Sequence, residues 1–169
     1  HRASAVCKFC DTDFVGTNGV NGGTYSAKDL VLKVKALWGE LDNKLIIFTG
    51  GEPMLQLDRE LIEECKNKGF NTAIETNGTI PINFDIDWVC VSPKHGSELV
   101  IKHGNELKTV FPQEGQNLDS FLDLDFEHLY LQPMDGINGK ENTIKTIQYC
   151  LEHPEWKLSI QQHKLIGMP

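Results

Sequence analysis

The chain has 169 residues, of which 40% are hydrophobic and 24% charged, so it can bury the core of one globular domain. Its net charge of -8 disfavours nucleic acid and anionic membranes as partners, and no apolar run is long enough to span a membrane. Together with the lack of a visible signal peptide, these features predict a soluble cytoplasmic protein.

The predicted elements begin after an N-terminal loop. Residues 1–25 lack hydrophobic periodicity and hold many Gly, Asn and Thr residues, which is typical of a loop. Ser26, with Asp29 in the position of a capping box, predicts the start of a helix. The apolar run Leu45–Thr49 predicts a buried strand, and the pattern of Leu57–Lys68 predicts a second helix.

Five more strands and one more helix are predicted in the rest of the chain. The strands are Asn71–Ile74, Trp88–Val91, Glu106–Phe111, Glu127–Leu131 and Lys157–Ile160, the helix is Glu141–His153, and a polar tail follows. Alternating strands and helices imply a mainly parallel sheet of the α/β class. A complete eight-stranded βα-barrel needs about 250 residues, so we expect a partial barrel.

Polar or glycine-bearing motifs recur directly after the predicted strands. They are Gly50–Pro53, Glu75–Gly78, Ser92–Lys94 and Gln132–Asp135. In parallel α/β folds the carboxyl edge of the sheet carries the ligand site. The sequence therefore predicts a site at this edge.

The cysteines divide into two groups. Cys65 and Cys150 fall in predicted helices and Cys90 in a predicted strand, where a free cysteine usually packs as a small apolar side chain. Cys7 and Cys10 form the only close pair, and the odd total argues against a disulfide framework.

This CxxC pair has several interpretations. A structural zinc site needs four ligands, but there is no second CxxC, and His95 and His103 have the wrong spacing. A redox dithiol is disfavoured by Asp11 and Asp13, which oppose a reactive thiolate. Two structural cysteines in a loop remain an alternative. An iron–sulfur cluster would need a further thiolate upstream of His1.

Five motifs carry a resemblance to a known family. Cys7–Phe14 resembles the cluster loop of the 7-carboxy-7-deazaguanine synthases, and Gly50–Pro53 resembles the GGEP motif of radical S-adenosylmethionine (SAM) enzymes. Glu75–Gly78 resembles the ETNG strand end of these enzymes, while Ser92–Lys94 and the tail Gln162–Pro169 are similar to the synthases in particular. The likeness covers essentially the whole chain, with the motifs in the family's order.

The resemblance implies a fold and an organisation. It implies an α/β fold, a partial, modified (β/α) barrel of the radical SAM type with about six parallel strands and few helices. Residues 1–169 would form a single radical SAM domain that lacks the family's N-terminal strand and first cluster cysteine. The tract before Cys7 suits the branch with a long insert between the first two cluster cysteines.

The resemblance also implies an activity. The enzyme would be a lyase that converts 6-carboxy-5,6,7,8-tetrahydropterin to 7-carboxy-7-deazaguanine with loss of ammonia, in queuosine and 7-deazapurine biosynthesis. Its cofactors would be a [4Fe-4S] cluster, SAM and Mg²⁺. Its electron donor would be flavodoxin-like, and the chain would be a homodimer acting on a small molecule, with no nucleic-acid or membrane partner.

The site residues follow from the same resemblance. Cys7 and Cys10 would hold the cluster, and Thr12 would give Mg²⁺ an oxygen ligand, although Asp11 or Asp13 could do so instead. The residues expected to bind SAM are Phe9, Gly51, Glu52, Ser92, Pro93, Lys94, Gln132, Pro133, Met134 and Asp135, with Glu75 and Asn77 as further candidates. Those expected to bind the substrate are Thr49, His163 and Pro169, the last through its terminal carboxylate.

Each assignment has a structural alternative. Gly50–Pro53 could be a simple strand-to-helix turn, Thr12 a loop-capping residue and Lys94 a solvated charge. The apolar pair Leu165 and Ile166 predicts that the tail docks rather than moves freely.

Two other functions remain open. A glycyl-radical-enzyme activase of the radical SAM superfamily would need a site for a partner's peptide loop. A non-catalytic zinc-binding module would give colourless protein that carries zinc, whereas an iron–sulfur protein would be brown.

Overall fold

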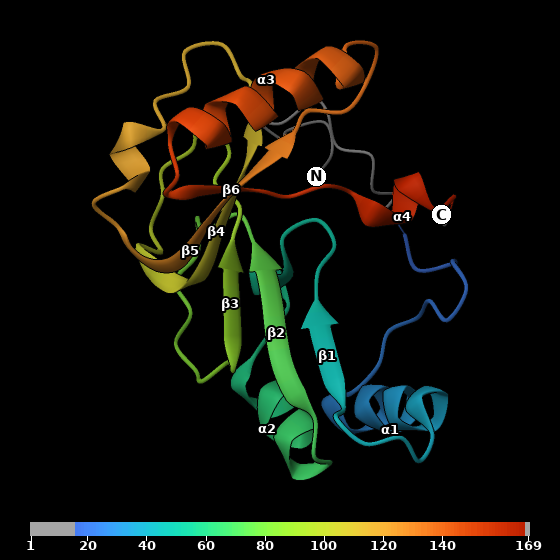
Figure 1. The fold of residues 1–169 in the computed structure, drawn as a ribbon. Coiled ribbons are helices and arrows are strands. Elements are labelled where there is room, and N and C mark those ends of the chain that lie inside the picture. Colours follow the sequence, from blue (N-terminus) through green and yellow to red (C-terminus); the bar gives the residue numbers. More distant parts are fainter. Residues whose placement is uncertain (1–15, 168–169) are drawn as a thin grey trace.

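The computed structural model describes residues 16–167, which form one parallel sheet with helices around it (Figure 1). The strands are β1 (Leu45–Phe48), β2 (Asn71–Thr76), β3 (Trp88–Val91), β4 (His103–Phe111), β5 (Asp125–Pro133) and β6 (Trp156–Leu158). The helices are α1 (Ala27–Trp38), α2 (Arg59–Asn67), α3 (Gly139–Glu152) and the short α4 (Gln162–Leu165), with 3-10 turns η2 (Pro53–Leu55) and η3 (Asp119–Phe121).

The strands lie in the sheet in the same order as in the chain. Every neighbouring pair from β1 to β6 is parallel. Crossover connections between parallel strands are right-handed. When each new strand is added on the same side of the previous one, all the connections therefore lie on one face of the sheet. The other face then lines the inside of a barrel. The predicted partial barrel of about six parallel strands with few helices is thus confirmed for the described residues.

Local signals set the beginnings of the first two long helices. The Oγ of Ser26 accepts from the backbone N–H of Asp29 at 3.2 Å and donates to its carboxylate at 2.6 Å, as the capping box predicts. Helix α2 begins later than the apolar pattern suggested because Asp58 is the N-cap and accepts from the N–H of Leu61 at 2.9 Å. Leu57 therefore lies outside the helix, although it is buried.

Strand β1 is only half buried, which corrects the expectation of a buried strand. Ile46 and Phe48 pack against the apolar cluster formed by Val31 of α1, Cys65 of α2 and Phe70. Leu45 and Ile47 point to the other face and are 41% and 54% exposed. The run is apolar throughout, but β1 is an edge strand of the described sheet and only one of its faces meets helices.

The three cysteines in the described part of the chain are packed as expected. Cys65 and Cys90 are buried, and Cys150 is half-buried against a cluster that contains Leu107, Leu131 and Trp156. The predicted polar tail contains the short helix α4. No helix within residues 16–167 is both long and apolar enough to cross a membrane.

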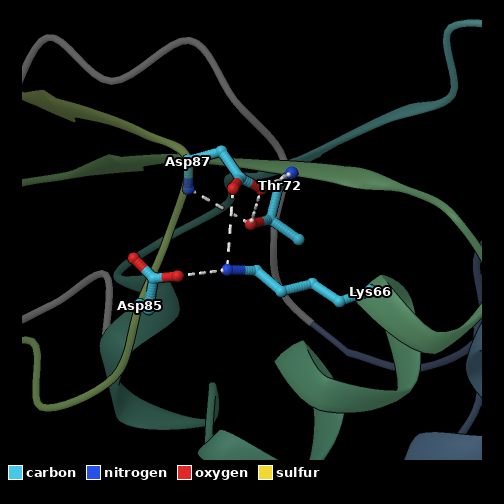
Figure 2. Close-up of polar contacts among 4 residues, drawn as sticks. All are labelled: Lys66, Thr72, Asp85 and Asp87. Carbon is cyan, nitrogen blue, oxygen red and sulfur yellow. Dashed lines mark hydrogen bonds and ion pairs between the residues drawn. The ribbon is translucent and has the colours of Figure 1, made fainter.

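A polar cluster joins α2 to the amino ends of β2 and β3 (Figure 2). The Asp87 carboxylate accepts from the N–H and Oγ1 of Thr72 at 2.7 and 2.8 Å, and Lys66 pairs with Asp85 at 2.6 Å. Although burial opposes it, the hydrogen bonds from Thr72 and the charge of Lys66 lower the pKa of Asp87. The cluster lies at the end of the sheet opposite to the predicted site, so its role is structural.

Candidate functional site

The motifs that follow the strands meet at one edge of the sheet. Because all six strands are parallel, their carboxyl ends point the same way, and Figure 1 shows the arrowheads of β1 and β2 directed toward the side where α4 lies. The segments on this edge are Thr49–Pro53 after β1, Asn77–Gly78 after β2, Ser92–Lys94 after β3, Gln132–Asp135 at the end of β5, and the tail after β6.

The carboxylate of Glu52 ties the first two strand ends together. Its Oε1 accepts from the N–H of Met54 at 3.0 Å and from Oγ1 of Thr76 at 2.7 Å, and its Oε2 accepts from the N–H of Asn77 at 2.8 Å. A carboxylate offers about four lone-pair sites, so these three bonds leave one acceptor position on Oε2. This position can accept one more hydrogen bond from a positively charged donor such as an ammonium group.

Gly50, two residues before Glu52, leaves the backbone open to a ligand. Gly50 has a φ of +125°, and a Cβ built there would meet no atom within 4 Å. Thr49 and Gly51 are exposed on the same turn. A molecule can therefore approach the main chain closely beside Glu52, as the resemblance to the GGEP motif requires.

The turn after β2 is held rigidly. Oγ1 of Thr76 accepts from the N–H of Gly78 at 3.1 Å, and Oδ1 of Asn77 accepts from the N–H and hydroxyl of Thr79 at 2.9 and 2.7 Å. The carbonyl of Gly78 accepts from the N–H groups of Val100 and Ile101. Asn77 therefore donates its N–H to Glu52 in a fixed geometry, while its side chain makes hydrogen bonds within the turn.

Gly78→Ala is expected to lower the free energy of unfolding by about 3 kcal/mol. Gly78 has a φ of +77°, and an added Cβ would lie 2.6 Å from Leu99 Cδ1 and 2.7 Å from Val91 Cγ1. Urea unfolding measures the loss. Gly69→Ala is the matched control, because Gly69 has the same φ of +77° but open space around it; that variant should lose only about 1–2 kcal/mol. Equal losses would contradict the packing argument.

The loop after β3 contains hydrogen bonds between its own residues. The N–H of Ser92 donates to the carbonyl of Thr76 at 2.7 Å, which joins this loop to the preceding strand end. The ammonium of Lys94 donates to both the carbonyl and the hydroxyl of Ser92 at 2.7 Å. Pro93 is buried, and Pro93 and Lys94 line a cavity of about 400 Å³ on the helix-facing side of β4.

The loop at the end of β5 is anchored through both backbone polar groups of Met134. Met134 donates its N–H to the carbonyl of Phe111 at 2.7 Å, and its own carbonyl accepts from Nδ2 of Asn142 at 2.9 Å. Asn142 lies on α3 and is 9% exposed. Asn142 was not predicted from the sequence; a polar residue on the inward face of an amphipathic helix is the signal that could have identified it.

A charged network lines the open face of the central strands. Cys90 on β3 lies beside Glu75 of β2 on one side and Glu106 of β4 on the other. Lys108 lies two residues after Glu106 and therefore on the same face of the sheet. Lys108 pairs with Glu75 at 2.9 Å, and the thiol of Cys90 donates to Glu106 at 3.4 Å. Ile74, adjacent to Glu75, packs on the opposite face with Ile62 of α2.

Burial and charge set the ionisation of this network. Burial, reinforced by the carboxylates nearby, raises the pKa of the Cys90 thiol to about 12, so the thiol stays protonated at neutral pH. Burial acts to lower the pKa of Lys108, but the hydrogen bond to Glu75 and the negative charges of Glu75 and Glu106 outweigh it and raise the pKa above its usual value. Lys108 is therefore a permanent cation inside the partial barrel, and no sequence motif points to it.

Several predicted site residues lie outside the described part of the chain. They are Cys7, Phe9, Cys10, Thr12 and Pro169. Within residues 16–167, no group of three or more His, Cys, Asp or Glu side chains is placed to hold a metal ion. The predicted SAM-binding residues other than Phe9 lie in the described part of the chain, and the predicted ligands of the cluster and of Mg²⁺ remain predictions.

The predicted substrate-binding residue His163 lies on α4 and is exposed. The following residues, Leu165 and Ile166, are 73% and 70% exposed, so the tail is not docked through them as expected. A helix of four residues presents too little apolar surface to bury both side chains. Lys164, between these residues and His163, pairs instead with Asp135 at 2.5 Å.

Comparisons with known proteins agree with the strand-end motifs. The radical SAM superfamily pattern matches residues 4–154. The chain is 51% identical to the 7-carboxy-7-deazaguanine synthase of Bordetella pertussis and 53% identical to that of Caulobacter vibrioides, in each case over 99% of this chain and 81% of the relative. The crystal structure of QueE from Escherichia coli matches with a TM-score of 0.64 and 28% identity, covering 81% of this chain and 64% of that one.

Proposed function

Since this chain belongs to the 7-carboxy-7-deazaguanine synthases of the radical SAM superfamily, we propose that it converts 6-carboxy-5,6,7,8-tetrahydropterin to 7-carboxy-7-deazaguanine with loss of ammonia. The reaction belongs to queuosine and 7-deazapurine biosynthesis. The observation that carries the proposal is the carboxyl edge of the sheet, where Glu52 keeps one free acceptor position beside the open backbone of Gly50.

The SAM site is assigned to the loops that meet at this edge. The assigned residues are Phe9, Gly51, Glu52, Ser92, Pro93, Lys94, Gln132, Pro133, Met134 and Asp135. Glu52 would accept a hydrogen bond from the amino group of SAM, and the fixed N–H of Asn77 holds this carboxylate in place. The Ser92–Lys94 and Gln132–Asp135 loops would flank the rest of the cofactor.

The cluster, the metal ion and the substrate have separate ligands. Cys7 and Cys10 would hold a [4Fe-4S] cluster and Thr12 a Mg²⁺ ion, while Thr49, His163 and Pro169 would bind the pterin. The cluster and SAM, when bound, would supply radical chemistry for hydrogen abstraction at carbon 6 of the substrate. The chain's own residues orient the pterin against SAM and exclude water from the radical.

The assembly is proposed on the same basis. Residues 1–169 would act as a single radical SAM domain, and the chain would form a homodimer that receives its electron from a flavodoxin-like protein. The negative charge of the chain, -8, does not favour a nucleic-acid partner.

The experiment is turnover of the pterin under anaerobic conditions. The intact polypeptide, reconstituted with iron and sulfide and supplied with SAM and a strong reductant, should yield 7-carboxy-7-deazaguanine and ammonia. The product is identified by its mass, with a reaction that lacks SAM as the control. Reductive SAM cleavage without any product from the pterin would overturn this assignment in favour of another radical SAM activity, such as a glycyl-radical-enzyme activase. Zinc-loaded protein without SAM cleavage would favour a zinc-binding module.

A further inference from the structure

Described residues of the C-terminal tail make polar contacts with the loop and strand of β5. The N–H of Ser159, just after β6, donates to the carbonyl of Leu131 on β5 at 2.8 Å. Further along, the ammonium of Lys164 on α4 lies 2.5 Å from the carboxylate of Asp135. Figure 1 shows the tail running from β6 to α4 on the side to which the arrowheads of β1 and β2 point.

The two large apolar residues in the described part of this tail do not pack into the core. Leu165 and Ile166 are 73% and 70% exposed, and α4 has only four residues. Such a short helix is marginal in water without tertiary contacts. The ion pair between Lys164 and Asp135 joins α4 to the loop at the end of β5.

The two partners of this ion pair differ in how firmly they are held. Asp135 follows Met134, whose N–H and carbonyl are both bonded, to Phe111 and to Asn142. Lys164 sits on the short helix, next to His163. The pair therefore fixes a weakly held segment to a firmly held one.

We propose that Lys164 is a positioning residue that orients the substrate-binding tail by its ion pair with Asp135. The inference rests on the proposed function, in which the Asp135 loop contacts SAM and the tail, through His163, contacts the pterin. The pair would set the tail at a fixed place relative to the cofactor loop before the pterin binds. Losing it would weaken pterin binding more than the later steps.

The test compares Lys164→Met with the wild-type enzyme in steady-state turnover. The KM for the pterin should rise about fivefold, the upper end for an exposed ion pair, while kcat changes less than about twofold. Lys164→Arg, which keeps the charge, should restore the KM to within about twofold. High salt should raise the KM of the wild-type enzyme and leave that of Lys164→Met almost unchanged, because salt screens exposed charges.

A matched control and a second readout separate this role from a general loss of stability. Lys145→Met removes another exposed ion pair, Lys145–Glu141 at 2.7 Å on α3, and should leave the KM unchanged. Amide hydrogen exchange, which needs no cofactor, should become faster at residues 162–166 in Lys164→Met and at no other segment. An unchanged KM, or a fall in kcat at constant KM, would overturn the proposal. Absence of turnover in the wild-type protein would instead refute the proposed function.

Discussion

Cys10→Ala is expected to bind no stable [4Fe-4S] cluster and to reduce SAM cleavage to background. Two thiolates in a CxxC spacing can ligate one cluster together, and removal of either leaves an iron without its protein ligand. Iron content and the visible absorption of the anaerobically reconstituted protein measure the loss, and the formation of methionine from SAM under a strong reductant measures the activity.

Cys150→Ala is the matched control for this substitution. Cys150 is a free cysteine, half-buried on α3 against the apolar cluster around Leu131. Its replacement removes a thiol without touching the proposed cluster and should leave the iron content and the cleavage unchanged. Full iron content in Cys10→Ala would contradict the assignment of the pair as cluster ligands.

Glu52→Gln is expected to lower the free energy of unfolding by about 2–3 kcal/mol and the affinity for SAM by roughly 10- to 100-fold. Oε2 of Glu52 accepts from the N–H of Asn77 at 2.8 Å, and Oε1 accepts from the N–H of Met54 at 3.0 Å. In the variant one of these two oxygens becomes an NH₂ group, which cannot accept, so one of the two N–H donors loses its partner. The negative charge that would pair with the amino group of SAM is lost as well.

Urea unfolding and equilibrium binding of SAM to the reconstituted protein measure the two effects separately. Glu63→Gln is the control, since Glu63 is an exposed residue of α2 and the same change of charge there should cost less than about 0.5 kcal/mol. A Glu52→Gln protein as stable as the control, with SAM affinity retained, would contradict the role of this carboxylate.

The parts of the fold that depend on local signals could be predicted from the sequence. The capping pair Ser26 and Asp29 predicted the start of α1, and the alternation of apolar runs with helical patterns predicted a parallel sheet. The position of the strand-end motifs at one edge followed from that parallel arrangement alone.

Features that depend on long-range contacts could not be predicted. The half exposure of β1 depends on which strand forms the edge of the described sheet, and no pattern within Leu45–Phe48 reveals it. The bond between Glu52 and Thr76 joins residues 24 positions apart. The tail was expected to dock through Leu165 and Ile166, whereas the contact that the structure forms is ionic and comes from Lys164.

The site was predicted only in outline for the same reason. Motif resemblance singled out Glu52, Asn77 and the Ser92 loop, which the structure brings together at the carboxyl edge of the sheet, but it gave no indication of their hydrogen bonds. Asn142 and Lys108 carry no motif, and their contacts to Met134 and Glu75 exist only once α3 and the strands have assembled.

The most direct measurement is the iron and sulfide content of the intact polypeptide after anaerobic preparation, followed by SAM cleavage under a strong reductant. A radical SAM synthase predicts about four iron and four sulfide ions per chain and SAM cleavage that requires them. A chain that holds no iron after this preparation and leaves SAM intact would contradict the account.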